Sequence, residues 1–225
     1  MNFSIIIPVF NEDQNIHNLI NEIFKIDYSY DFEIIVVNDK STDETEESII
    51  NLKKKYSNLY LINNDNNYGQ SFSIHNGVKN AKSNVIVTLD GDGQNNPLDI
   101  EKIYKEYIKH NDVFLVGGIR KNRNDSYLKI ISSKIANKIR NFFLKDGCPD
   151  SGCGIKIFDK NIFLSLPFFD GMHRFLPALF IKKGANCLYV NVDHRPRKFG
   201  NSKYGTIKRA VSGLLNIIKV LYLPK

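Results

Sequence analysis

Short hydrophobic runs rich in Ile and Val alternate with longer amphipathic stretches through the first half of the chain. Such runs are typical of strands with both faces covered, and the stretches between them repeat apolar residues at helical spacing. The pattern predicts strands at residues 3–9, 32–38, 59–63, 84–90 and 113–119. It predicts helices at residues 12–26, 43–56, 70–81 and 98–110.

The second half is less regular. Its pattern predicts a helix, a strand, a helix, a strand, a polar basic loop and a last helix, at residues 126–144, 153–158, 175–183, 188–194, 194–205 and 207–223. Strands that alternate with helices predict an α/β fold with a mostly parallel sheet flanked by helices. We expect one domain at residues 1–205 and an appended amphipathic C-terminal helix at 206–225.

Composition agrees with a globular enzyme-sized domain. The chain has 225 residues, of which 42% are hydrophobic, so it can bury a sizeable core. No stretch approaches the roughly 18 consecutive apolar residues of a membrane span, and the N-terminus lacks the basic start of a signal peptide. Cys148, Cys153 and Cys187 lack the paired spacing of a metal site, which favours reduced thiols in a cytosolic protein.

The net charge of +7 hides an asymmetry between the halves. Residues 1–112 hold 10 Lys and Arg against 18 Asp and Glu, whereas residues 113–225 hold 21 against 6. An acidic half that suits a metal is thus followed by a basic half that suits anions. No nucleic-acid partner is expected, because the basic residues are spread over several elements and no zinc-finger or RNA-binding motif accompanies them.

Residues 89–97 read LDGDGQNNP and close the fourth predicted strand. Ligands of parallel α/β sheets bind beyond the carboxyl ends of the strands. Asp90 and Asp92 would repel each other there unless a cation lay nearby, and carboxylate oxygens are ligands that Mg²⁺ and Mn²⁺ prefer. Gln94 offers a neutral oxygen, and Gly91 lets the backbone approach a ligand closely. An ordinary Asp/Gly turn is the alternative interpretation.

Four ordered motifs in the first half resemble those of the family 2 glycosyltransferases, which have the GT-A fold. They are IIIPVFNE at residues 5–12, IIVVNDKSTDET at 34–45, NYGQ at 67–70 and LDGDGQNNP at 89–97. Motifs of the second half look like the dolichyl- and polyprenyl-phosphate glycosyltransferases: VGGIR at 116–120, Ser133 with Asn137, DSGC at 150–153, MHRFLP at 172–177 and the loop 194–205. The resemblance covers about residues 3–205.

The resemblance implies a role for residues that match the family's motifs. The nucleoside pocket of the sugar donor would be lined by Pro8, Phe10, Glu12, Val37 and Asp39. A divalent Mg²⁺ or Mn²⁺ on the donor diphosphate would be held by Asp90, Asp92 and Gln94, with Gly91 beside them. The acceptor phosphate would meet Arg120, Lys129 and Ser133, and the donor diphosphate would be covered by Arg197 and Lys203.

Three residues depart from the family's pattern, two at the donor and one at the acceptor. Phe10 stands where Tyr is frequent, and Asn38 replaces a frequent acid. Because these two blur the donor pocket, the donor stays open between GDP- and UDP-sugars. At the acceptor phosphate Lys129 stands where Arg is usual, and a lysine offers a point charge in place of a bidentate fork.

The implied reaction is inverting, metal-dependent transfer of a mannose- or glucose-like hexose to a polyprenyl or dolichyl phosphate. A phosphate monoester is already mostly ionised at neutral pH, so the acceptor needs no dedicated base. Lys129, Ser133 and Asn137 follow at intervals of four residues, so they share one helix face and with Arg120 could cradle a phosphate.

The last predicted helix, at residues 207–223, indicates whether the chain acts at a membrane. It has a narrow polar stripe and a mostly apolar surface, which favours a helix lying on the membrane surface of a peripheral protein at the cytoplasmic face. A core helix or a dimer helix is the alternative. Two further functions stay open: transfer to a soluble saccharide or cell-envelope acceptor, and non-catalytic binding of a nucleotide-sugar.

Overall fold

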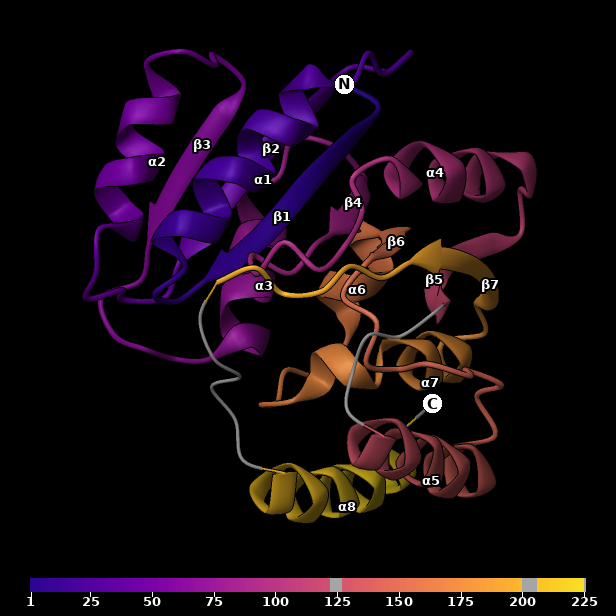
Figure 1. Cartoon of the computed structure of the whole chain (residues 1–225). Coiled ribbons are helices and arrows are strands. Elements are labelled where there is room, and N and C mark those ends of the chain that lie inside the picture. Colours follow the sequence, from indigo (N-terminus) through magenta and orange to yellow (C-terminus); the bar gives the residue numbers. More distant parts are fainter. Residues whose placement is uncertain (122–126, 200–205, 225) are drawn as a thin grey trace.

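A seven-stranded sheet forms the centre of the molecule (Figure 1). The computed structural model describes residues 1–121, 127–199 and 206–224, and the side chains of these apart from 127–129 and 206–211. The strands lie in the order β3-β2-β1-β4-β6-β5-β7. Their bounds are Phe3–Val9 (β1), Phe32–Asn38 (β2), Leu59–Asn63 (β3), Val85–Thr88 (β4), Val113–Lys121 (β5), Lys156–Asp159 (β6) and Asn186–Asp193 (β7).

The sheet is parallel except at β6. Strands β1, β2, β3 and β4 pair in parallel, as do β5 and β7, whereas β6 runs antiparallel between β4 and β5. The mostly parallel sheet expected from the sequence is therefore confirmed. The carboxyl ends of β1, β2 and β4 lie side by side, so the residues that follow these three strands share one edge.

Helices cover both faces of the sheet. Their bounds are Asp13–Lys25 (α1), Thr45–Lys53 (α2), Gln70–Asn80 (α3), Asp99–Lys109 (α4), Tyr127–Leu144 (α5), Lys160–Ser165 (α6), Leu176–Lys182 (α7) and Thr206–Tyr222 (α8), with a 3₁₀ turn at Met172–Arg174 (η1). One hydrophobic cluster joins α1, α2 and α4 to the sheet, and another joins α3, α6, α7 and α8 to its other face. Alternate residues of most strands enter the two clusters, as with Ile5 and Ile6 of β1.

The predicted elements are present, with differences at their ends. The strand expected at 84–90 ends at Thr88, because the backbone N–H of Asp90 turns to the side-chain oxygen of Asn95. The strand expected at 153–158 begins only at Lys156. Helix α6 and η1 were not predicted, because six and three residues are too few to show a helical period.

Helix α3 lies close against the sheet at Gly77. A methyl group on this glycine would stand 2.6 Å from Ile6 Cγ2 and 3.0 Å from Val37 Cγ2, both in the core. Gly213 in α8 offers a contrast, since a methyl group there would meet no atom within 4 Å.

We expect Gly77→Ala to destabilise the fold by about 1–3 kcal/mol, because the added methyl overpacks a core that cannot move away. Gly213→Ala should be neutral or stabilising by about 0.5–1 kcal/mol, as for an alanine in a helix interior. Urea unfolding of both variants measures the difference. Equal stability of the two would contradict the close packing of α3.

Candidate functional site

The acidic motif residues meet where β1, β2 and β4 end. Val9 of β1 pairs with Asn38 of β2, and its carbonyl accepts a hydrogen bond of 2.8 Å from the N–H of Asp39. Asp90 follows β4, which pairs with the other side of β1. The topology thus brings together three motifs that lie far apart in the sequence.

Asp90 is held in a fixed orientation. Its Oδ1 accepts a hydrogen bond of 2.8 Å from Gln70 Nε2 at the start of α3. Its carboxylate also lies against the backbone of Gly154, where a Cβ would stand 2.1 Å from Asp90 Oδ2. A side chain at position 154 would therefore displace the carboxylate.

Burial and the neighbouring Asp92 carboxylate raise the pKa of Asp90 to about 6 from an ordinary 3.8. Lys156, Arg120 and the hydrogen bond from Gln70 act in the opposite direction. Lys156 is itself buried, and its Nζ donates to the carbonyls of Ser151 (3.4 Å) and Cys153. Burial and the repulsion from Asp92 therefore outweigh these nearby cations, and both disfavour the charged form of Asp90.

Asp92 binds Arg197 across the site. Arg197 Nη2 lies 2.6 Å from Asp92 Oδ2, and Asp92 Oδ1 accepts the N–H of Gln94 at 3.1 Å. Gln94 also fixes the segment that carries Arg197, because its Nε2 donates to the carbonyl of Arg195 at 3.3 Å. Asp92 and Gln94, two of the predicted metal ligands, therefore lie next to Arg197, which was predicted to cover the donor diphosphate.

The side-chain oxygens of Asp90, Asp92 and Gln94 suit a hard divalent ion. Within the described part of the chain no three His, Cys, Asp or Glu side chains gather as a metal cluster. Mg²⁺ commonly uses only one or two protein carboxylates and takes its other oxygens from water and substrate phosphates. Such an ion would relieve the repulsion between the carboxylates of Asp90 and Asp92.

Glu12 faces the other terminal nitrogen of Arg197. Its Oε1 lies 3.6 Å from Arg197 Nη1, and its Oε2 accepts 2.7 Å from Asn15 Nδ2. Glu12 is only 8% exposed. The contact with the nucleoside that the resemblance implies for Glu12 stays a prediction.

Asp39 is engaged by the loop before α3. Its carboxylate accepts hydrogen bonds from the N–H groups of Tyr68 (3.0 Å) and Gly69 (2.7 Å) and from Asn64 Nδ2 (2.8 Å). These contacts fix the start of α3 and thereby place Gln70 against Asp90. A contact of Asp39 with the donor base stays a prediction.

The other residues expected at the donor lie along the same edge. Pro8 pairs with Val37 in the sheet, and the side chain of Val37 is buried in the core, so a role of Val37 in binding would fall to its backbone. Phe10 is half-buried just after β1. Gly91 leaves no room for a side chain, since a Cβ would stand 2.6 Å from Val9 Cγ1. Lys203 lies outside the described residues.

Arg120 forms a bidentate ion pair at the end of β5. Its Nε and Nη2 donate to the two oxygens of Asp150, each at 2.7 Å. Ser133 is half-buried on α5, and Lys129 belongs to the same helix with a side chain outside the described part. Asn137, one turn after Ser133, accepts 3.0 Å from Ser151 Oγ, next to Asp150. Helix α5 and Arg120 therefore approach the same short segment.

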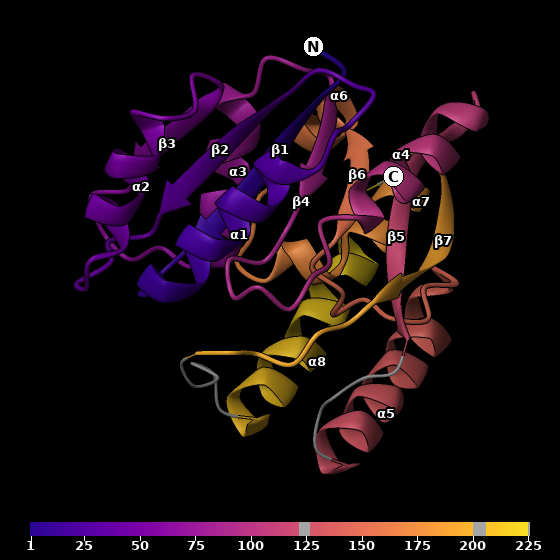
Figure 2. The same ribbon diagram turned by 45° about the horizontal axis from the view of Figure 1, so that its top comes forward.

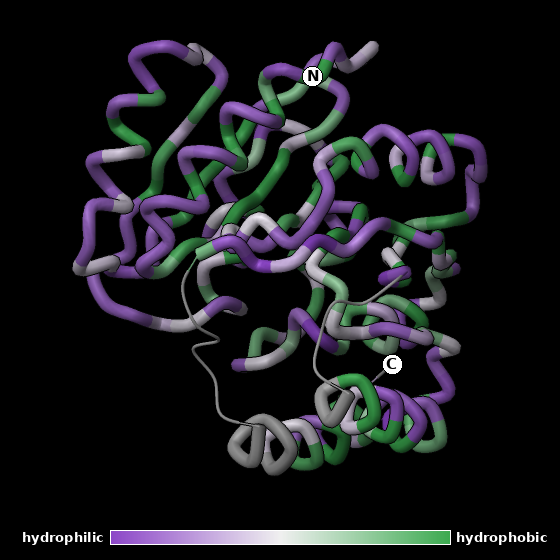
Figure 3. The backbone as a smooth tube through the Cα atoms, viewed as in Figure 1, coloured by the Kyte–Doolittle hydropathy of each residue, from purple (hydrophilic) through white to green (hydrophobic). Residues whose placement is uncertain are grey.

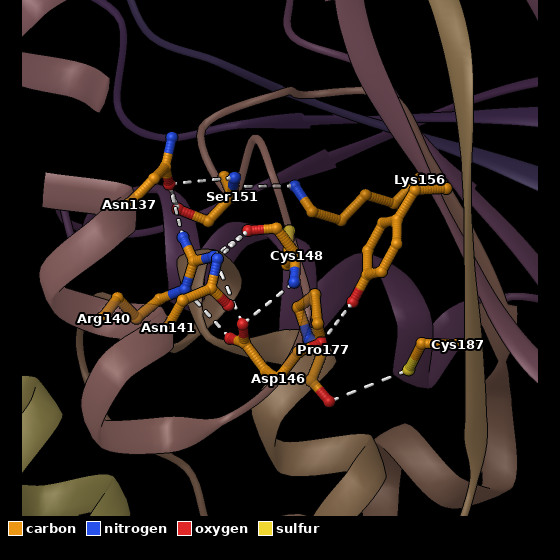
Figure 4. Close-up of polar contacts among 10 residues, drawn as sticks. Asn137, Arg140, Asn141, Asp146, Cys148, Ser151, Lys156, Pro177 and Cys187 are labelled. Atoms are coloured by element: carbon orange, nitrogen blue, oxygen red, sulfur yellow. Dashed lines mark hydrogen bonds and ion pairs between the residues drawn. The ribbon is translucent and has the colours of Figure 1, made fainter. Parts of the chain in front are cut away.

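A buried ion pair fixes that segment (Figure 4). Arg140 of α5 donates to both oxygens of Asp146 at 2.9 and 3.2 Å and to the carbonyl of Cys148. Arg140 and Asp146 are 3% and 2% exposed. The segment that leads to Asp150 is thereby attached to α5 through interactions that water does not reach.

Sequence reasoning did not assign a role to several residues of this site. Gln70 and Asp150 lie inside the motifs NYGQ and DSGC, which indicated their neighbourhood but not their contacts. Lys156 gave no signal, since a single lysine in a short strand is typical of an exposed position. Gly154 gave none either, because only the fold brings its backbone against Asp90.

We expect Asp90→Asn to stabilise the metal-free protein at pH 7.5 by about 1–3 kcal/mol. The folded-state pKa of about 6 lies above the ordinary 3.8, so wild-type Asp90 favours the folded state below about pH 4 and loses that contribution as pH rises through about 6. The gain should vanish near pH 4, and Mn²⁺ should stabilise the wild type but not the variant. Urea unfolding at both pH values tests this; a variant less stable than wild type at pH 7.5 would contradict it.

Known proteins resemble this chain over most of its length. The model of "Glycosyl transferase family 2" matches residues 4–166. A dodecaprenyl-phosphate galacturonate synthase of Rhizobium johnstonii is 31% identical over 99% of the chain, and an undecaprenyl-phosphate 4-deoxy-4-formamido-L-arabinose transferase of Aeromonas hydrophila is 29% identical over 97%. The chain spans 67% and 65% of the length of these two relatives.

Solved structures share the fold. Glucosyl-3-phosphoglycerate synthase of Mycobacterium tuberculosis, in complex with Mn²⁺, UDP and phosphoglyceric acid, matches with a TM-score of 0.75 at 18% identity, covering 99% of this chain and 79% of the synthase. The same enzyme has been solved with Mg²⁺ and UDP, at a TM-score of 0.73 over 96% of this chain and 78% of that one. This likeness confirms the GT-A fold expected from the sequence, and the family match over residues 4–166 shows that the chain belongs to glycosyl transferase family 2.

Proposed function

We propose that this chain transfers a sugar from a nucleotide-sugar to the phosphate of a polyprenyl lipid at a membrane surface, with a divalent cation on Asp90 and Asp92. The observation that carries the proposal is that helix α5 connects the site to an exposed apolar surface. The inner side of this helix is polar and attached to the site, and its outer side is apolar and exposed.

An ordinary surface helix turns its apolar side toward the protein, whereas α5 turns its polar side toward the protein and its apolar side outward. Arg140 donates hydrogen bonds to Asp146 and Cys148 before Asp150, and Asn137 accepts one from Ser151 just after it. Ile135, Ile139 and Phe142 lie on the outer side and are 54%, 38% and 76% exposed. A lipid acceptor needs this arrangement, since its phosphate must reach the site while its chain stays in an apolar environment.

Helix α8 packs beside α5 and extends the apolar surface (Figure 2). Of the 18 large hydrophobic side chains exposed in the described part, ten lie on these two helices. They are Ile131, Ile135, Ile139, Phe142 and Phe143 on α5, and Leu214, Leu215, Ile218, Leu221 and Tyr222 on α8. In Figure 3 both helices lie at one end of the molecule and carry hydrophobic residues among hydrophilic ones. The concentration of exposed hydrophobic side chains on α5 and α8 favours an interaction surface.

The cationic side chains around this apolar surface favour a membrane as its binding partner. Exposed Lys134, Lys138 and Lys219 lie on the same two helices, and cationic side chains next to an apolar face attract anionic lipids. Within the described ranges, every helix is too short or too polar to cross a membrane. We therefore propose that α5 and α8 rest on the bilayer surface.

The chemistry is a displacement at the anomeric carbon. A phosphate oxygen of the acceptor forms a bond to this carbon, the bond to the donor diphosphate breaks, and the nucleoside diphosphate leaves with the electron pair, so the configuration inverts. Arg120, oriented by Asp150, would bind the acceptor phosphate together with Ser133 and Lys129. The cation, when bound, would supply positive charge against the leaving diphosphate.

The donor is a nucleotide-sugar whose base and sugar stay open between GDP- and UDP-sugars. The solved neighbours hold UDP, so UDP-sugars are the first to test. Among acceptors, the relatives act on polyprenyl phosphates by name, whereas the solved neighbour carries phosphoglyceric acid. The exposed apolar faces favour the lipid.

We expect Asp92→Ala to lower kcat for sugar transfer to a polyprenyl phosphate by about 10²–10³-fold, the loss typical of removing one electrostatic stabiliser. Asp65→Ala, at an exposed position outside the site, is the matched control. The assay compares polyprenyl phosphate with 3-phosphoglycerate as acceptor, using Mn²⁺ and a panel of nucleotide-sugars. Transfer only to the soluble acceptor would overturn the lipid proposal, and undiminished transfer by the variant would overturn the metal role.

We expect the double variant Phe142→Glu with Leu215→Glu to bind liposomes of one-third anionic lipid at least about tenfold more weakly, since each buried side chain contributes about 1.5–3 kcal/mol. The control is Ile108→Glu with Leu98→Glu, two changes of similar exposure near α4, on another part of the surface. Flotation measures the bound fraction. Equal flotation of wild type and both variants would contradict binding through α5 and α8.

A further inference from the structure

A strap of six residues, 194–199, lies along the acidic edge of the sheet. Asn95 and His194 form an antiparallel bridge, and the N–H of Arg195 donates to the carbonyl of Gln94 at 2.9 Å. At the other end Asn15 Nδ2 donates to the carbonyl of Phe199 at 3.2 Å. Figure 1 shows this segment running from β7 across to the end of β1. The strap is therefore fixed on both sides of the two aspartates.

Arg197, in the middle of the strap, stands between two carboxylates. Its Nη2 is 2.6 Å from Asp92 Oδ2, and its Nη1 is 3.6 Å from Glu12 Oε1. The side chains of all three are largely shielded from water, at 23% exposure for Arg197, 13% for Asp92 and 9% for Glu12. Charge interactions in such a place are screened less than at an open surface.

A divalent ion and this guanidinium compete for the same carboxylate, because Asp92 Oδ2 binds Arg197 and its Oδ1 already accepts the N–H of Gln94. An ion on Asp92 would lie next to Arg197 Nη2 and repel it, and the short Asp92–Arg197 pair must open before Asp92 Oδ2 can bind a metal. Glu12 is placed to accept the guanidinium once it leaves. Its Oε2 is held by Asn15, and its Oε1 already faces Arg197.

We propose that Arg197 occupies the cation's place on Asp92 before loading, and that Glu12 is the positioning residue that receives the guanidinium when a divalent ion binds. The inference rests on the metal site of the proposed function. In this proposal Glu12 interacts with Arg197, whereas the resemblance to the family implied that Glu12 contacts the nucleoside of the donor. Loading the metal thereby turns Arg197 away from Asp92 while keeping it at the edge where the diphosphate is to be held.

The first test is the affinity for Mn²⁺ alone, without nucleotide or lipid, measured by the electron paramagnetic resonance signal of free Mn²⁺. Arg197→Gln should bind Mn²⁺ about tenfold or more tightly than wild type, the scale of a coupling between close charges. Arg195→Gln is the matched control, since Arg195 lies in the same strap but pairs with Glu22 at 2.7 Å. Its affinity should equal that of wild type.

The second test addresses Glu12. With Glu12→Gln the guanidinium has lost its alternative partner, so Mn²⁺ should bind several-fold more weakly than to wild type. In the double variant Glu12→Gln with Arg197→Gln this loss should disappear, because there is no guanidinium to displace. A loss that persists in the double variant would mean that Glu12 acts on the metal directly, which overturns its role as receiver.

Failure of this inference is distinguishable from failure of the proposed function. Unchanged or weaker Mn²⁺ binding by Arg197→Gln, or tighter binding by both arginine variants, overturns the competition by Arg197 and leaves the metal site intact. Absence of Mn²⁺ binding by every variant and by wild type, at pH 7.5 with thermal unfolding showing folded protein, overturns the metal site and the inference together.

Discussion

The repulsion between Asp90 and Asp92 is the constraint around which this edge of the sheet is arranged. Two carboxylates partly removed from water require positive charge, and the fold supplies it from three directions. Lys156 and Arg120 lie on the side of Asp90, and Arg197 binds Asp92 directly. The pKa of Asp90 nevertheless rises to about 6, because burial and the repulsion from Asp92 outweigh these cations. A divalent ion that binds both carboxylates would relieve this repulsion.

The single antiparallel strand β6 explains how that balance is reached. Because β6 lies beside β4 and runs toward the opposite end, the residues just before it return to the carboxyl end of β4. Gly154 thereby comes against Asp90, and Lys156 follows two residues later with its Nζ on nearby carbonyls. A parallel strand in this position would bring its first residues to the other edge. The departure from a purely parallel sheet therefore has a chemical consequence.

The sequence predicted the strands well because Ile and Val runs with both faces covered have few alternatives. It also located Asp90, Asp92 and Gln94, since a strand end and a motif coincide there. It did not predict contacts between distant residues: Arg197 and Asp92 are 105 positions apart, and no local pattern links them. Lys156 and Gly154 were missed for the same reason, because their significance arises only from pairing in the sheet. Short elements such as α6 carry too few residues for a period.

Helix α5 links the charge pattern of the site to the outer surface. A buried pair such as Arg140 with Asp146 is weak evidence for stability, since hydrophobic residues of similar volume often stabilise a core as well or better. The pair is better explained by position: it holds the segment before Asp150, and Asp150 orients Arg120. The exposed isoleucines and Phe142 on the opposite side are not explained by folding either, because they contact solvent. Both anomalies have one explanation if an amphiphile with a charged head and an apolar chain lies along this helix.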